Sequence, residues 1–114
     1  MKDSSDYTPD RGHIVWLDFN PSKGSEQKGR RPAVIMTPHS YNTFGLCYCL
    51  PITSKIKGYP IEVKLNQSQT TQGVVLTNQM LAIDWNATQL KYIEGIDIDT
   101  LQIIDSRLRT ILSL

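Results

Sequence analysis

Over the first 96 positions, apolar residues come in short runs that are separated by polar and turn-forming residues. The runs are rich in β-branched and aromatic residues, which is typical of buried strands. In residues 61–65 apolar and charged side chains alternate, as on a half-exposed strand. We expect five or six short strands, within residues 13–19, 32–37, 46–53, 59–65, 72–83 and 90–96. Such a succession favours a small antiparallel barrel or a strongly twisted sheet.

The spacing of apolar residues changes at the end of the chain. From residue 97 to residue 114 apolar side chains recur at helical spacing, and polar side chains occupy the other side. Asp97 is placed to cap this helix. The stripe must cover either the open side of the sheet or a partner subunit, and its main members are Leu101, Ile104, Leu108 and Ile111. The predicted fold is therefore mainly β with a C-terminal helix.

Length and composition fit one small folded domain. The chain has 114 residues, of which 39% are apolar and 20% charged. We expect a flexible N-terminal segment at residues 1–10 and a single domain at residues 11–114. No run approaches the roughly 18 to 20 apolar residues that span a bilayer. Residues 1–12 hold three aspartates and no apolar stretch, unlike a secretory signal, so we expect a cytoplasmic protein with no membrane association.

The two cysteines give no sign of a metal or a cofactor. Cys47 and Cys49 are two residues apart, which places them on one face of one strand and is a poor geometry for a disulfide. No Cys-x-x-Cys motif or histidine pair accompanies them to complete a tetrahedral set. We expect buried small side chains there, no metal site and no cofactor.

The net charge of +1 hides an uneven distribution. Residues 27–61 hold five cations and no acid, whereas the rest of the chain is net acidic. A basic middle on an acidic frame indicates a local site for a polyanion, and the alternative is a solvated basic face without a ligand. The cations are Lys28, Arg30, Arg31, Lys55 and Lys57.

The longest irregular stretch is residues 20–31, which we expect to form a loop with one carboxylate, Glu26. A loop of this length on a small scaffold tends to carry function, and the alternative is a disordered hairpin tip. Pro32 restricts the residue before it to an extended conformation. Arg31 is therefore expected at the rim of the sheet.

Several segments together resemble the MazF/PemK toxin family, in order along nearly the whole domain. They are FNPSKGSEQKGRRP at 19–32, AVIMTP directly after it, LPITS at 50–54, KGYP at 57–60 and GVVLTNQ at 73–79. The resemblance implies a compact barrel of the kind shared with CcdB toxins and a homodimer. It also implies the toxin of a type II toxin-antitoxin system, a sequence-selective and metal-independent endoribonuclease for single-stranded mRNA. A cognate antitoxin with a disordered acidic and apolar tail would block its RNA groove.

The resemblance places the main catalytic roles on Arg31 and Thr53. RNA cleavage without a metal needs the 2′-hydroxyl to attack the adjacent phosphate, so negative charge must be stabilised and two protons moved. Arg31 suits charge stabilisation because guanidinium offers two fixed donors, and Thr53 offers a hydroxyl. Glu26 is the candidate general base, or else it orders the loop by pairing with Arg30 or Lys28. RNA-binding roles are expected for Lys23, Gln27, Lys28, Arg30, Ser54, Lys55, Asn78 and Gln79.

Two departures from the family pattern bear on proton transfer. Ser25 stands where some relatives have a histidine, and Asn78 where some have an aspartate. We therefore assign Asn78 and Gln79 to base recognition. The alternatives are an inactive RNA-binding relative, or a CcdB-like inhibitor of a DNA topoisomerase (gyrase) acting through its C-terminal helix. The basic Arg31 and Thr53 region favours RNA, and the helix end ILSL lacks the tryptophan of the CcdB type.

Overall fold

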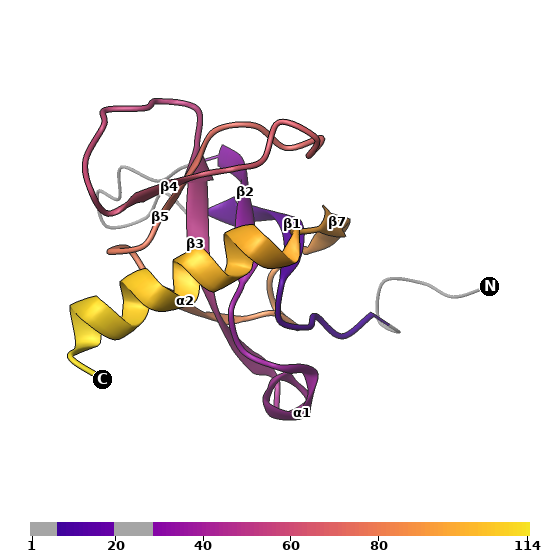
Figure 1. Ribbon diagram of the computed structural model, residues 1–114. Helices are drawn as coiled ribbons and strands as arrows, with labels where there is room; N and C mark the ends of the chain where they lie inside the picture. The colour runs from indigo at the N-terminus through magenta and orange to yellow at the C-terminus, as the bar shows by residue number, and fades with distance from the viewer. Residues whose placement is uncertain (1–6, 20–28) are drawn as a thin grey trace.

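The computed structural model describes residues 7–19 and 29–114 (Figure 1). These residues form a mainly antiparallel β protein with a C-terminal helix, as the sequence predicts. The strands are β1 (His13–Phe19), β2 (Gly29–Ile35), β3 (Leu46–Thr53), β4 (Glu62–Lys64), β5 (Val74–Leu76), β6 (Leu81–Asp84) and β7 (Lys91–Gly95). The helices are α1 (His39–Asn42) and α2 (Ile98–Leu112).

The strands follow the order β4-β5-β3-β2-β1-β7, and every pairing is antiparallel. The long strand β3 joins two parts of the sheet. Its first half pairs with β6 through residues 46–49, and its last two residues pair with β5. This sharing of one strand gives the strongly twisted, barrel-like arrangement that the run of short strands predicts.

Both faces of the central strands are buried, each in its own apolar cluster. One cluster lies between the sheet and α2 and includes Ile14, Val34 and Leu50. The other lies on the opposite face and includes Val15 and Cys49. Adjacent residues such as Ile14 and Val15 enter different clusters because successive strand side chains point to opposite faces. Burial on both faces explains why apolar residues follow one another directly at Ile14 and Val15 of β1 and at residues 49–52 of β3.

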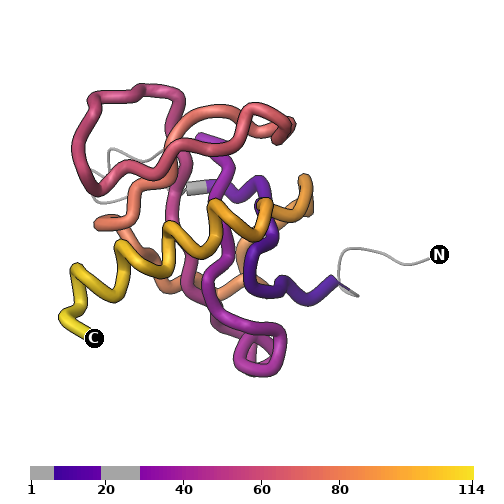
Figure 2. Tube along the Cα trace, viewed as in Figure 1, coloured from indigo at the N-terminus to yellow at the C-terminus, as the bar shows by residue number. Residues whose placement is uncertain are grey.

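Helix α2 lies across one face of the sheet (Figure 2). Asp97 caps it, because its carboxylate accepts from the Thr100 amide at 3.1 Å. In the first half of the helix, Leu101 and Ile104 are buried against the sheet. In the second half, Ile111 and Leu112 are 45% and 58% exposed. The predicted apolar stripe therefore covers the sheet through Leu101, Ile104 and Leu108, whereas its last member, Ile111, is half-exposed.

The structure differs from the sequence predictions in three local details. Residues 72–83 hold two strands, β5 and β6, which makes seven strands among the described residues where five or six were expected. Helix α1 was not predicted, because a four-residue helix after Pro38 shows no apolar period. The expected loop at residues 20–31 is shorter, since β2 already begins at Gly29 and includes Arg31.

Part of the expected N-terminal segment contacts the domain. Pro9 is buried, and the Asp10 carboxylate accepts from the Arg11 and His39 amides at 2.8 and 2.9 Å. Residues 1–6 lie outside the described residues. In the part of the chain that the structure describes, neither helix has the length and apolar character needed to cross a membrane.

Candidate active site

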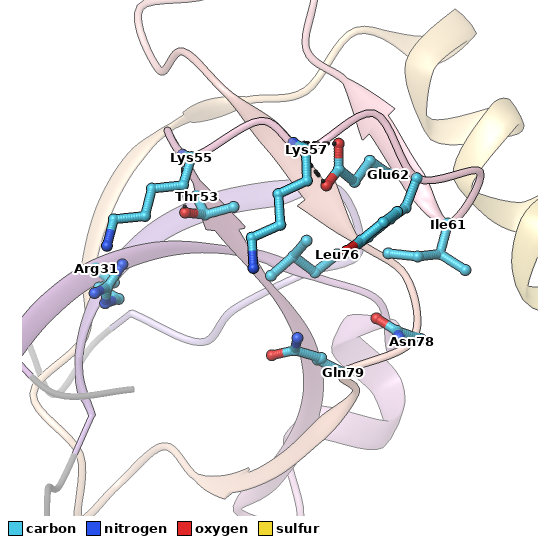
Figure 3. A pocket seen from close by; sticks show the side chains of 10 residues that line it. Arg31, Thr53, Lys55, Lys57, Ile61, Glu62, Leu76, Asn78 and Gln79 are labelled. Carbon is cyan, nitrogen blue, oxygen red and sulfur yellow. Dashed lines mark hydrogen bonds between the residues drawn. The ribbon is translucent and has the colours of Figure 1, made fainter. Parts of the chain in front are cut away.

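A cavity of about 340 Å³ lies where β2 begins and β3 ends, beside β5 and the segment that connects β3 to β4 (Figure 3). Strand side chains form its floor, and Lys55 and Lys57 extend into it from the β3–β4 connection. The cavity thus contains three cations, Arg31, Lys55 and Lys57, and one carboxylate, that of Glu62. The complete lining is Arg31, Thr53, Lys55, Lys57, Tyr59, Ile61, Glu62, Leu76, Asn78 and Gln79.

Strand register brings Arg31 and Thr53 together. Ala33 of β2 pairs with Pro51 of β3 in antiparallel register. Two residues outward along each strand stand Arg31 and Thr53, and a spacing of two keeps both side chains on the same face of the sheet as the pair they follow. Neighbouring strands thereby present a guanidinium and a hydroxyl to one cavity, although the two residues are far apart in sequence.

The Arg31 guanidinium has an unsatisfied donor. Its Nε atom is buried and has no hydrogen-bond partner within residues 7–19 and 29–114. A buried polar group without a partner costs about 1–3 kcal/mol, so such groups are rare in folded proteins and call for an explanation. A ligand oxygen entering the cavity would satisfy this donor.

The Thr53 hydroxyl is held in place by the backbone around it. Its oxygen accepts a hydrogen bond from the Lys55 amide at 3.1 Å, which leaves the hydroxyl proton available to a ligand. Gly73 of the neighbouring segment lies against the Thr53 carbonyl so closely that a Cβ atom there would overlap its oxygen. A glycine is therefore needed at this position for Thr53 to sit where it does.

The β3–β4 connection is held in place by Glu62 and Arg107. The Glu62 carboxylate accepts from the Gly58 amide at 2.9 Å and from the Lys57 amide at 3.2 and 3.3 Å. Gly58 has a φ of +84°, a conformation that favours glycine. From α2, the Arg107 guanidinium donates to the carbonyls of Pro60 and Glu62. These contacts fix the backbone from which Lys57 reaches the cavity.

The structure brings together five of the residues predicted for the site, which are Arg31, Thr53, Lys55, Asn78 and Gln79. Ser54 follows Thr53 but does not line the cavity. Arg30 lines two other depressions, because it precedes Arg31 on the strand and points to the opposite face. The remaining predicted residues, Glu26, Lys23, Gln27 and Lys28, lie outside the described residues.

Sequence reasoning named Lys57 only as one cation of the basic middle, without a role at the site, and it did not assign Tyr59 or Glu62 to the site. Lys57 and Tyr59 belong to the KGYP segment quoted for the family resemblance, so that segment was the available signal. Glu62 carried no signal, because on an alternating strand it resembles any solvated charge. Within the described residues there is no group of three His, Cys, Asp or Glu side chains that could hold a metal ion. Burial raises the pKa of both Cys47 and Cys49 to about 12, so these thiols stay protonated.

Fold and cavity together define a small antiparallel β protein with a cationic pocket built around an arginine and a threonine. The chain belongs to the family of PemK-like, MazF-like toxins of type II toxin-antitoxin systems, whose family profile matches residues 10–112. The predicted family resemblance is thereby confirmed.

Individual relatives agree with this assignment. The chain is 41% identical to the endoribonuclease toxin MazF of Escherichia coli K12 over 109 residues, which cover 95% of this chain and 97% of the relative. It is 32% identical to the E. coli K12 endoribonuclease toxin ChpB over 90 residues, which cover 74% and 77%. The crystal structure of Deinococcus radiodurans MazF matches with a TM-score of 0.88 and 40% identity, covering 96% of this chain and all of that one. A MazE–MazF crystal structure from the same organism matches with a TM-score of 0.87 and 40% identity, covering 96% and 99%.

Proposed function

We propose that this toxin is an endoribonuclease that cleaves single-stranded RNA by attack of a ribose 2′-hydroxyl on the adjacent phosphate. The observation that carries the proposal is the buried, unpaired Nε donor of Arg31 in a cationic cavity that also holds the Thr53 hydroxyl. Both groups offer hydrogen bonds to phosphate oxygens at a point where negative charge builds up during cleavage. The family and the names of its endoribonuclease relatives support the same activity.

In the proposed reaction the 2′-oxygen forms a bond to phosphorus while the bond from phosphorus to the 5′-oxygen breaks. The 2′-hydroxyl proton passes to a base and the leaving 5′-oxygen gains a proton, so the products are a 2′,3′-cyclic phosphate and a 5′-hydroxyl. Arg31 stabilises the doubly charged phosphorane with its fork of donors, and Thr53 donates to a nonbridging oxygen. We assign the general base to Glu26.

Substrate binding follows from the rest of the cavity. Lys55 and Lys57 supply positive charge for the flanking phosphates, and the amides of Asn78 and Gln79 hydrogen-bond base edges. Attack requires the 2′-oxygen in line with the leaving 5′-oxygen, a geometry that a splayed single strand reaches and an A-form helix disfavours. We therefore propose selectivity for single-stranded RNA.

Partners are proposed from one exposed surface and from the relatives. Exposed apolar side chains of α2, which include Ile103, Ile111 and Leu112, fit a second copy of the chain, so we propose a homodimer. Structures of relatives include MazE–MazF complexes, and on that basis we propose a cognate antitoxin for this chain. We place the toxin in the cytoplasm with its mRNA substrate.

Cleavage of RNA in excess EDTA tests the proposal. Because Arg31 and the lysines supply the positive charge that a metal would otherwise provide, we expect undiminished cleavage of single-stranded RNA and resistance of the same sequence in a duplex. Product analysis is expected to find 2′,3′-cyclic phosphate ends. A requirement for added Mg²⁺, or 5′-phosphate products, would overturn the mechanism, and mapping the 5′ ends of cut transcripts would give the recognition sequence.

A further inference from the structure

A second depression, of about 660 Å³, lies on the face of β2 opposite to the active-site cavity. We call the surface that lines it the Trp16 shelf. Trp16 is 38% exposed although its neighbours Val15 and Leu17 are buried. The shelf is formed by Trp16, Arg30, Lys91, Tyr92 and Ile93, and none of these residues lines the active-site cavity.

Sheet register places the Trp16 indole between two cations. Lys91 of β7 is directly opposite Trp16 of β1, so their Cβ atoms are about 5 Å apart on one face. Arg30 of β2 is opposite Asp18, which stands two residues from Trp16 and shares its face. Arg30, Trp16 and Lys91 therefore cross three adjacent strands, with the aromatic ring in the middle.

The acidic groups near the shelf do not cancel its charge. Asp18 is the one carboxylate that shares this face beside Trp16 in the described part of β1. Glu94, three residues beyond Lys91, is engaged elsewhere, because its carboxylate accepts from the Thr70 and Thr71 amides at 3.0 and 2.6 Å. Two cations thus accompany one carboxylate, and the shelf stays net positive.

We propose that the Trp16 shelf binds single-stranded RNA outside the cleavage pocket, an inference that rests on the proposed ribonuclease function. A base stacks on the Trp16 indole, and Arg30 and Lys91 contact the phosphates on either side. An aromatic ring flanked by cations matches the alternation of base and phosphate along an unpaired strand, and such stacking is tolerant of sequence. The shelf thus adds affinity without adding to the cleavage specificity.

Continuity with the active site favours RNA over a protein partner as the occupant. Arg30 and Arg31 are consecutive residues of β2, with Cα atoms about 3.8 Å apart, yet one faces the shelf and the other the cavity. An RNA strand that leaves the cavity around this end of β2 meets the shelf within a few nucleotides. The shelf also lies at the β7 side of the sheet, away from the exposed C-terminal end of α2 (Figure 1).

The test compares cleavage of two RNAs with the same cleavage site. The short RNA extends about two nucleotides on each side of the site, and the long RNA about ten. For Trp16→Ala we expect kcat/KM to fall about tenfold on the long RNA, the size of one lost stacking contact, and to stay unchanged on the short RNA. Trp16→Phe is expected to keep most of the activity. Lys91→Ala is expected to lower the salt dependence on the long RNA by about 0.7 in log-log slope, as for one lost phosphate contact.

Phe44→Ala is the matched control, because Phe44 is an aromatic residue 84% exposed beyond α1, and we expect no effect on either RNA. Equal losses on both RNAs, or no loss on the long RNA, would overturn the proposal. So would unchanged cleavage of both RNAs together with weakened binding of poly-L-glutamate, which would assign the shelf to an acidic protein. If the wild type cuts neither RNA, the proposed ribonuclease function itself fails, which is a different result from any of these.

Discussion

The corner around Asn42 and the active-site cavity both hold polar groups inside the fold, but among the described residues only the cavity contains a buried side-chain donor without a partner. Asn42 is fully buried, and its amide donates to the carbonyls of Pro9 and Thr37, both at 2.8 Å. Its side-chain oxygen accepts from the Thr37 hydroxyl at 2.7 Å, and its backbone carbonyl accepts from the Trp85 indole. In the cavity, by contrast, the buried Nε of Arg31 has no partner in the described ranges.

This difference indicates that the Asn42 corner contributes to the stability of the fold and the cavity to the reaction. A fully satisfied buried network rigidifies the structure around it, whereas a buried donor without a partner lowers stability and is available to a ligand. Strand β2 runs between the two regions. Its last residues are buried in the core, and its first residues, which include Arg31, are at the cavity. Substitutions in the Asn42 corner are therefore expected to change folding, and substitutions in the cavity to change the reaction.

Arg31 gives the largest expected effect on catalysis. Arg31→Ala and Arg31→Lys are both expected to raise the barrier by on the order of 3 kcal/mol, roughly a hundredfold in rate, because lysine keeps the charge but loses the two-pronged geometry. The free energy of unfolding is expected not to fall, since the substitution removes a buried Nε donor that has no partner in the described fold and whose burial costs stability. Single-turnover cleavage and urea unfolding measure the two quantities. Cleavage near the wild-type rate by folded Arg31→Ala would place the chemistry elsewhere.

Substitution of Asn42 is expected to lower stability and to leave the cleavage rate unchanged, the reverse of the result for Arg31. Asn42→Ala removes three side-chain hydrogen bonds and leaves the Pro9 and Thr37 carbonyls without their amide donor. We expect the free energy of unfolding to fall by about 2–3 kcal/mol. At a temperature where circular dichroism shows the variant folded, its cleavage rate is expected to match the wild type. A slower reaction in the folded variant would show that this corner and the cavity are coupled.

The two regions also differ in how far sequence could predict them. The strands at residues 13–19 and 46–53, the cap at Asp97 and the family resemblance came from local pattern, so they could be found without a structure. The Asn42 corner could not, because its partners Pro9, Thr37 and Trp85 are brought together only by the tertiary fold. The same holds for the opposite orientations of Arg30 and Arg31, which depend on the strand beginning earlier than predicted.

The Glu62 carboxylate accepts hydrogen bonds that hold the backbone of the β3–β4 connection beside the cavity. Glu62→Ala frees the Lys57 and Gly58 amides, and the lysine loses its fixed backbone. We expect kcat/KM for RNA to fall about tenfold, mainly through a higher KM, because one ordered phosphate contact is lost. Glu62→Gln keeps an acceptor oxygen and is expected to restore much of the loss.

Glu94→Ala is the matched control for Glu62. The Glu94 carboxylate also accepts from two backbone amides, those of Thr70 and Thr71, but it does not line the cavity. We expect this variant to lose stability and to keep the wild-type KM. Equal changes of KM in both variants would mean that Glu62 acts through general stability and has no positioning role.

Asp97 gives the smallest expected effect. Like Asn42 it is a hydrogen-bonded group, and the pH dependence of the free energy of unfolding tests its contribution. Hydrogen bonds from the Thr100 hydroxyl and amide to the Asp97 carboxylate hold its pKa below the ordinary value. Because the folded pKa is the lower one, the carboxylate stabilises the fold above its unfolded pKa of about 3.9, and this contribution is lost as the pH falls through the folded pKa. Asp97→Ala is expected to cost about 1 kcal/mol at neutral pH.

Asp97→Asn separates the cap from its charge. Asparagine caps a helix about as well as aspartate but does not titrate, so we expect near wild-type stability at pH 7. Asp10 and Glu94 also have lowered pKa values, which is why only the difference between wild type and Asp97→Asn isolates this residue. Below about pH 4 the wild type is expected to lose stability faster than the variant in urea unfolding. Parallel pH profiles of stability would show that Asp97 stabilises α2 through geometry alone. The cleavage rate of the folded protein is expected to be the same in the wild type and in Asp97→Asn.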